Sequence, residues 1–291
     1  MPRATAMDRT EENWHPLRQW ANRAAVDAID GVDRVLGSAD ARMRFSRLWS
    51  SRQNAVLMYH SVGGIPGYVG SLPVERFVAD LEALVERYDV VDLPAVLDPT
   101  ETRPKRVALT FDDGFVDFST TVLPLLREFD VPATVFVSSA FVDDESRALA
   151  YERHELEPSD DRLLMTEAEL AELVEEDLVT IGNHTRTHPR LSTLDTATKR
   201  EEILGAKSDL ESRFGVTVDR FCYPYGDFDG EAVDIAASAH DLSVTIDRGL
   251  VAPSTDPHRI PRIDGNDPRA EMWWRLTDLR YVPATVLGRT L

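Results

Sequence analysis

The feature that most constrains the fold of this chain is an alternation, from about residue 54 onward, of short apolar runs with longer helical segments. The apolar runs are continuous, which is typical of parallel strands buried on both faces. We predict strands at Ala55–Tyr59, Val90–Leu93, Arg106–Phe111, Ala133–Val137, Val179–Gly182, Phe221–Tyr223 and Leu242–Ile246. We predict helices at Pro73–Arg87, Asp117–Phe129, Thr166–Glu176, Thr196–Phe214 and Gly230–Ala239. Alternating βα units of this number indicate a barrel or a doubly wound sheet.

Two local patterns refine this plan. Thr166-Glu167-Ala168-Glu169 has the S/T-x-x-E form of a capping box, which predicts a helix start at Thr166. The acidic stretch Asp143–Asp161 is interpreted as a surface insertion.

The composition is that of a globular protein with a strong acidic bias. The 291 residues carry a net charge of −19, which disfavours nucleic acid as a partner because phosphates would be repelled. Only Lys105, Lys199 and Lys207 are lysine among 32 basic residues. An acidic, lysine-poor surface is typical of proteins that work in concentrated salt, a halophilic-type surface, although a GC-rich genome also favours arginine. Cys222 is the single cysteine, so no intrachain disulfide is expected.

The N-terminal region differs from the rest of the chain. Residues 1–52 are predicted to form a helical extension, and residues 53–291 the catalytic domain. The segment Arg42–Arg52 mixes arginine with apolar residues, so it suits either peripheral contact with a membrane or packing against its own domain. No run is long enough to span a bilayer, and no signal peptide is evident, so a cytoplasmic location is expected. The oligomeric state is not predicted.

Residues able to bind a metal follow two of the predicted strands. Asp112, Asp113 and Gly114 come directly after Arg106–Phe111. Adjacent residues on an extended chain point in opposite directions, so the two carboxylates can take different roles only if the strand bends there. One would then bind a metal while the other transfers protons. The alternative is an ordinary Asp-Asp-Gly turn.

The second metal-binding pattern follows Val179–Gly182. His184 and His188 are four residues apart, and one helical turn or a tight loop would bring both rings to one side. Neutral imidazoles suit zinc and similar metals. Two unrelated surface histidines are the alternative.

Two further strand ends carry polar groups. After Phe221–Tyr223, Pro224-Tyr225-Gly226 forms a rigid turn, whose backbone N–H could stabilise an oxyanion, and Arg220 could orient a carboxylate. After Ala55–Tyr59, His60 would ordinarily be a structural histidine, but beside a metal it becomes a candidate general acid.

Together these motifs resemble the polysaccharide deacetylase family, also called carbohydrate esterase family 4 or the NodB-homology domain. The resemblance covers about residues 54–264. It rests on Thr110-Phe111-Asp112-Asp113-Gly114, on His184-Thr185-Arg186-Thr187-His188, and on Arg220 to Gly226, which matches R-x-x-x-P-Y-G. The family resemblance implies a distorted (β/α) barrel with fewer than eight strands, and removal of N- or O-acetyl groups from sugars.

The resemblance also implies roles for individual residues. Asp113, His184 and His188 would hold one divalent metal, with Zn²⁺ expected and Co²⁺ or Ni²⁺ as alternatives. Asp112 would be the catalytic base, Arg220 would orient Asp112, and the backbone N–H of Tyr225 would form part of the oxyanion hole. An acetylated carbohydrate is the implied substrate.

In one respect the sequence departs from the common family pattern. Many members carry a late Leu-x-His motif that supplies the general acid, and this sequence has none. Leu57-Met58-Tyr59-His60 instead follows an early strand, which resembles the permuted branch of poly-N-acetylglucosamine deacetylases. His60 is therefore expected to be the general acid. Arg259-Ile260-Pro261-Arg262 resembles a late segment of that branch, with no role assigned.

Two other functions stay open on the sequence alone. A relative of the family could cleave a non-sugar amide, ureide or imide, and a non-catalytic sugar-binding protein could keep the fold. The complete set of two aspartates and two histidines argues against a pure binding protein, because binding needs no catalytic base.

Overall fold

The computed structural model describes residues 53–65, 68, 70–98, 105–143, 146–157 and 162–277. The chain divides into two compact units, one of Ser50–Asp267 and one of Met1–Trp49 with Pro268–Leu291. The described part of the latter contains helix α9 (Arg269–Arg275). The predicted N-terminal helical extension, residues 1–52, lies outside the described residues.

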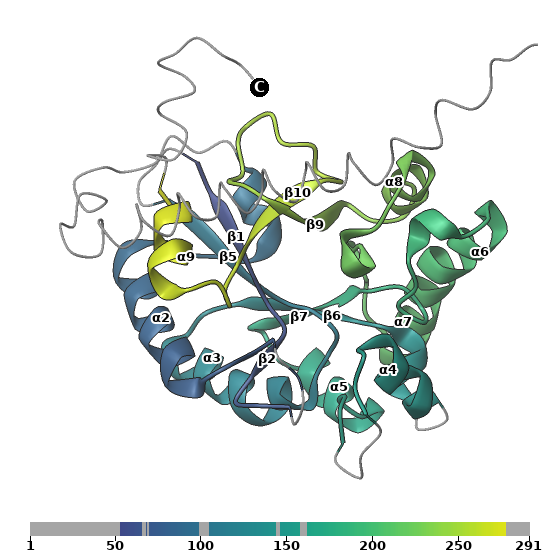
Figure 1. The fold of residues 1–291 in the computed structure, drawn as a ribbon, viewed down its shortest axis with the longest axis horizontal. Coiled ribbons are helices and arrows are strands. Elements are labelled where there is room, and N and C mark those ends of the chain that lie inside the picture. Colours follow the sequence, from purple (N-terminus) through teal and green to yellow (C-terminus); the bar gives the residue numbers. More distant parts are fainter. Residues whose placement is uncertain are drawn as a thin grey trace, which may run out of the picture. The chain divides into compact units, whose positions relative to one another are not determined.

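Parallel strands in the unit Ser50–Asp267 close into a barrel (Figure 1). The order around the barrel is β1-β10-β9-β8-β7-β6-β5, and β5 pairs with β1 to complete the ring. The bounds are β1 (Ala55–Tyr59), β5 (Arg106–Phe111), β6 (Ala133–Val137), β7 (Val179–Asn183), β8 (Arg220–Cys222), β9 (Leu242–Arg248) and β10 (Ile260–Asp264). The prediction of a barrel with fewer than eight strands is confirmed.

Three short strands lie outside this ring. β4 (Asp89–Val90) pairs with the first two residues of β5. β2 (Ser61–Val62) and β3 (Ser71–Leu72) form a separate parallel pair directly after the residues that end β1.

Helices cover the outside of the barrel, as Figure 1 shows for α2, α3, α5 and α7. The bounds are α2 (Val74–Arg87), α3 (Leu123–Phe129), α4 (Arg147–Arg153), α5 (Glu167–Val174), α6 (Thr196–Arg200), α7 (Ala206–Phe214) and α8 (Gly230–Ala237). Short 3₁₀ helices occur at Leu93–Leu97, Ser139–Val142, Leu191–Thr193 and Pro224–Gly226. The capping box predicted at Thr166 is confirmed, with the Thr166 hydroxyl accepting from the Glu169 N–H. Within the described ranges, no helix has the length and apolarity that a bilayer span requires.

The differences from the predicted elements have local causes. The strand expected at Val90–Leu93 ends at Val90, because Asp92 caps a 3₁₀ helix that begins at Leu93. Wider π-type turns at Phe118–Val122 and Glu201–Gly205 interrupt two segments that the sequence pattern predicts as single helices. Strand β10 was not predicted, since Pro261 and Arg262 break the apolar run.

Apolar side chains from successive strands fill the barrel. The fully buried residues Val56, Ala108, Phe136, Cys222 and Val244 belong to one cluster, although they come from five different strands. Burial of each large apolar side chain contributes roughly 1.5–3 kcal/mol. This packing fixes the strands in register and therefore brings their carboxyl ends, and the polar residues that follow them, to one mouth of the barrel.

Candidate metal centre and catalytic residues

Asp112 and Asp113 follow the end of β5 at a bend in the chain. The Asp112 N–H donates to the carbonyl of Tyr59 at 2.9 Å, which continues the pairing of β5 with β1. Asp113 and Gly114 then adopt left-handed conformations, with φ of 73° and 70°. A side chain at position 114 would place its Cβ 2.8 Å from Val137, so only glycine fits. The bend allows the two adjacent carboxylates to face different partners.

His184 and His188 lie in a tight loop after β7 rather than in a helical turn. Thr185 and His188 have positive φ, and the Thr185 hydroxyl accepts from the His188 N–H at 3.0 Å. Glu202 holds the loop from outside, because its carboxylate accepts from the N–H groups of Arg186 and Thr187 at 2.9 and 2.8 Å. These contacts fix the backbone of the loop that carries both histidines.

Asp113, His184 and His188 bring three potential ligand atoms together. His184 Nε2 and His188 Nε2 are 3.2 Å apart, and they lie 3.5 and 3.3 Å from Asp113 Oδ1. Tetrahedral zinc with bonds near 2.0–2.2 Å requires ligand atoms roughly 3.3–3.5 Å apart. Asp113 Oδ1 is buried and has no hydrogen-bond partner among the described residues. The donor set and its spacing therefore fit a divalent transition metal.

Asp113 and His188 have the protonation states that a metal requires. Burial raises the pKa of Asp113, but His154, His184 and His188 lower it by more, so this pKa lies well below the usual range. Burial, together with the neighbouring His184, lowers the pKa of His188 to about 3. Burial lowers the pKa of His184, but contacts with Cys222 and Asp113 raise it by more, so a metal would have to displace a proton from this ring. Nδ1 of His184 lies 2.8 Å from the carbonyl oxygen of Cys222, to which its N–H would donate. In the neutral ring this leaves the lone pair of Nε2 available to bind a metal.

Arg262 in β10 is the residue that holds Asp112. Its two terminal nitrogens each lie 2.8 Å from a different oxygen of the Asp112 carboxylate, and its Nε donates to the carbonyl of Thr245. Burial raises the pKa of Asp112, but the charge and hydrogen bonds of Arg262 lower it by more, so the net pKa is below the usual value. Asp112 is therefore ionised and fixed in orientation.

The prediction that Arg220 orients Asp112 is wrong. Arg220 pairs with Asp92 and donates to the Thr134 hydroxyl at 2.7 Å. The reason lies in the topology: Arg220 is the first residue of β8, at the opposite end of the barrel strands from Asp112, which follows the last residue of β5.

His60 and Tyr225, the other two predicted catalytic residues, both border this cluster. His60 Nε2 lies 4.0 Å from Asp112 Oδ2, and the side chain is 24% exposed, so it is accessible at the mouth. Tyr225 has a positive φ of 56°, and its ring contacts that of His188 with centroids 4.4 Å apart. Six of the seven predicted site residues thus gather at the carboxyl ends of the strands, and Arg220 does not.

Two residues near the centre were not assigned by the sequence analysis. Arg262 lay in a segment singled out by resemblance but without a role. His154 belongs to Asp143–Asp161, which was predicted to be a surface insertion, yet its side chain is 4% exposed and its Nδ1 lies 3.7 Å from Asp113 Oδ2. Part of that segment is therefore buried beside the site. The only sequence signal that could have pointed to His154 is that it is one of just seven histidines in the chain.

Comparison with known proteins agrees with this geometry. The family model for polysaccharide deacetylases matches residues 100–241. The chain is 30% identical over 140 residues to a chitooligosaccharide deacetylase of Bradyrhizobium, covering 46% of this chain and 52% of that protein. It is 26% identical over 187 residues to the poly-beta-1,6-N-acetyl-D-glucosamine N-deacetylase of Escherichia coli K12, covering 55% of this chain and 27% of that protein.

A solved structure shares the fold. IcaB from Ammonifex degensii superposes with a TM-score of 0.65 at 19% identity, covering 79% of this chain and 99% of that chain. The chain spans about half or less of the two named sequence relatives, whereas it covers nearly all of this structure.

Proposed function

We propose that this chain, whose residues 100–241 match the family model for polysaccharide deacetylases, is a member of that family and a metal-dependent hydrolase. It would remove acetyl groups from N-acetylated sugars of a polysaccharide or glycan precursor. The observation that carries the proposal is the spacing of Asp113 Oδ1, His184 Nε2 and His188 Nε2, each 3.2–3.5 Å from the others, beside a second carboxylate that is ionised and clamped. The deacetylase relatives from Bradyrhizobium and Escherichia coli support the substrate class.

Asp113, His184 and His188 are proposed as the protein ligands of one divalent metal, with zinc the expected ion because two imidazoles and one carboxylate suit it. When bound, such an ion lowers the pKa of water and polarises the acetamide carbonyl. The chain itself fixes the ligand geometry, through the bend at Asp113 and the loop that Glu202 anchors.

Asp112 is proposed as the general base. It lies at the end of β5 beside Asp113, and its lowered pKa keeps it ionised and able to accept a proton from water. Arg262 occupies both carboxylate oxygens from one side, which fixes the direction in which the remaining lone pairs point. Arg262 thus acts through Asp112 as a positioning residue.

His60 is proposed as the general acid. An amine leaves readily only when it is protonated, so deacetylation of an amide needs a proton donor near the scissile bond. His60 Nε2 lies 4.0 Å from Asp112 Oδ2, and the His60 side chain is partly exposed at the mouth, where a substrate could reach it. The backbone N–H of Tyr225 is proposed to stabilise the oxyanion, since this residue packs on His188.

A combined metal and acetate assay tests the proposal. Purified protein should hold about one divalent ion per chain and release acetate from N-acetylglucosamine oligomers. His184→Ala and His188→Ala should lose metal and activity together, whereas His258→Ala is the matched control, because His258 contacts Ser243 away from the centre. Full metal occupancy in the His184→Ala/His188→Ala double variant would disprove the ligand assignment. Metal binding without acetate release from any sugar would point to a non-sugar amide instead.

A further inference from the structure

His154 is delivered to the centre by a segment that none of the family motifs includes. It directly follows α4, and its side chain is 4% exposed. The ring packs against Phe115 and Phe141, with centroid separations of 5.2 and 6.3 Å, and lies 5.3 Å from the ring of His188. His154 is therefore enclosed on one side by aromatic rings and on the other by the metal-binding cluster.

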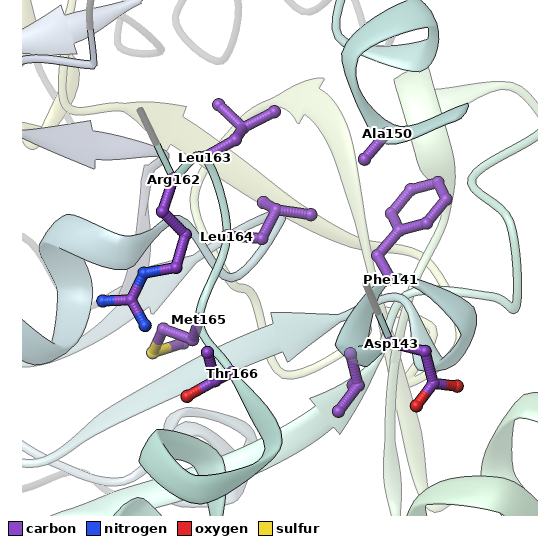
Figure 2. Close-up of a pocket in the computed structure, with 9 residues that line it drawn as sticks. Phe141, Asp143, Ala150, Arg162, Leu163, Leu164, Met165 and Thr166 are labelled. Atoms are coloured by element: carbon purple, nitrogen blue, oxygen red, sulfur yellow. The ribbon is translucent and has the colours of Figure 1, made fainter. Parts of the chain in front are cut away.

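The segment that carries His154 is anchored by apolar packing. Ala150 and Tyr151 of α4 belong to one buried cluster with Phe115, Phe141 and Leu163. Figure 2 shows Phe141 and Ala150 on one side of a small pocket and Leu163 and Leu164 on the other. None of the proposed metal ligands lines this pocket, so it is separate from the proposed metal centre.

The two ring nitrogens of His154 have unlike surroundings. Nδ1 lies 3.7 Å from Asp113 Oδ2, whereas Nε2 is buried and has no hydrogen-bond partner among the described residues. An imidazole with a single N–H has one donor nitrogen and one acceptor nitrogen. A buried N–H without an acceptor is unfavourable, so in this form the hydrogen belongs on Nδ1, which faces a carboxylate, and not on Nε2.

The two oxygens of Asp113 consequently face different histidines. Oδ1 faces His184 and His188, and Oδ2 faces His154. Among the described residues, two sets of potential ligand atoms lie within 4.8 Å of one another, Asp113/His184/His188 and Asp112/His184/Cys222. His154 belongs to neither, so it approaches the centre through Asp113 rather than as a ligand itself.

We propose that His154 is a positioning residue of the metal centre, whose Nδ1–H holds Asp113 Oδ2 and thereby keeps Oδ1 directed at the metal. The inference rests on the proposed metal site. It requires the separation of 3.7 Å to shorten to hydrogen-bond length, a movement of roughly 0.5–1 Å, in the metal-bound protein. Partners of this kind around metal ligands typically change metal affinity about 10–100-fold.

Three substitutions separate hydrogen bonding from packing. His154→Asn places an amide N–H near the position of Nδ1, His154→Gln places one near the position of Nε2, and His154→Leu keeps only the apolar volume. Zinc affinity of the full chain is measured with zinc alone, by competition with a chromogenic chelator. We expect the Asn variant to remain near the wild-type affinity and the Gln and Leu variants to lose about 10–100-fold.

Controls keep the outcomes distinct. His258→Asn, away from the centre, should match the wild type. If the wild type does not bind zinc, the proposed metal site itself is wrong. The role of His154 is overturned if the wild type binds zinc and all three variants bind it equally well. It is also overturned if the Leu variant retains as much zinc affinity as the Asn variant.

A measurement on the unmodified chain guards against misfolding of the variants. Long-range ¹H–¹⁵N NMR spectra of the zinc-loaded wild type report which imidazole nitrogen carries the hydrogen. The proposal expects His154 as the Nδ1–H tautomer, and an Nε2–H tautomer would overturn it.

Discussion

Replacement of Arg262 by methionine tests which arginine controls the proposed catalytic base. The Arg262 side chain is 0% exposed, and its guanidinium accounts for both short contacts to the Asp112 oxygens, each 2.8 Å long. Methionine fills much of the same volume without a charge or a donor. The substitution therefore leaves a buried carboxylate without its cationic partner.

The expected size of the effect follows from this burial. Removing one partner of a buried ion pair typically destabilises a protein by about 3–5 kcal/mol. At about 2–4 °C per kcal/mol for a unit of this size, the melting temperature should fall by roughly 6–20 °C at pH 7. The same substitution in an Asp112→Asn background should cost much less, because a neutral amide does not need a cation.

The pH dependence of stability and activity gives a second test of the contact between Arg262 and Asp112. The lowered pKa of Asp112 in the wild type contributes stability that is present above the unfolded value and is lost as pH falls through the folded value. Without Arg262 the pKa of Asp112 should rise, because burial raises it and only the weaker effects of His60 and His184 still lower it. The stability deficit of Arg262→Met should therefore shrink as pH falls, first through the raised pKa of Asp112 in the variant and then below about 4, where the wild type loses its own contribution. The acid limb of the activity profile should move to higher pH.

Arg220→Met is the matched control in urea unfolding and acetate-release assays. The Arg220 side chain is nearly as buried as that of Arg262. Its partner Asp92, however, is 44% exposed and lies away from the metal ligands. This variant should lose less stability and keep the wild-type acid limb. The reasoning is refuted if Arg262→Met leaves that limb unchanged, or if Arg220→Met moves it instead.

Three further substitutions test the remaining groups. Asp112→Asn should lower acetate release by at least ~10²-fold while metal content by elemental analysis stays unchanged; wild-type turnover would disprove its role as base. His60→Ala should keep the metal, lose about 10²-fold in amide turnover and lose the alkaline limb, with a smaller loss on an activated ester; equal losses would make His60 structural. Burial raises the pKa of Asp117 to about 6, so its stabilising contribution is present below about 4 and lost as pH rises through 6. As pH rises from about 4 to 6, the Asp117→Asn variant should therefore become more stable relative to the wild type, as measured by urea unfolding. A difference in unfolding free energy that does not change with pH would contradict this.

The apolar runs predicted parallel strands, in either a barrel or a doubly wound sheet, and the family resemblance favoured the barrel. β1, β5 and β6 have the predicted bounds, and every residue of β1 and β6 is buried. The prediction failed where local chemistry opposed the tertiary role. β10 contains Pro261 and Arg262, and the arginine is tolerated only because Asp112, from a strand far away in sequence, neutralises it.

The candidate site divides in the same way. The candidate ligands could be singled out because they follow strands, and parallel strands present their carboxyl ends at one mouth. The family resemblance then distinguished Asp113 as a ligand from Asp112 as the base. The partners of those residues could not. Arg262 reaches Asp112 across 150 residues, and His154 reaches Asp113 from the end of a short helix. Neither contact has a periodicity or spacing that a single sequence displays.

The position of His60 near the start of the barrel sequence follows from how the barrel closes. β1 lies between β5 and β10, and its register pairs Tyr59 with Phe111. The residues that follow these partners, His60 and Asp112, are therefore neighbours at the mouth, although 52 positions separate them in the chain. β10, on the other side of β1, contributes Arg262 to the same carboxylate. In a closed barrel the first strand in the sequence has neighbours on both sides, like every other strand. A proton donor that follows β1 can therefore serve Asp112 as well as one that follows a late strand. The early His60 motif is thus compatible with the proposed chemistry, and the test of His60→Ala addresses this arrangement directly.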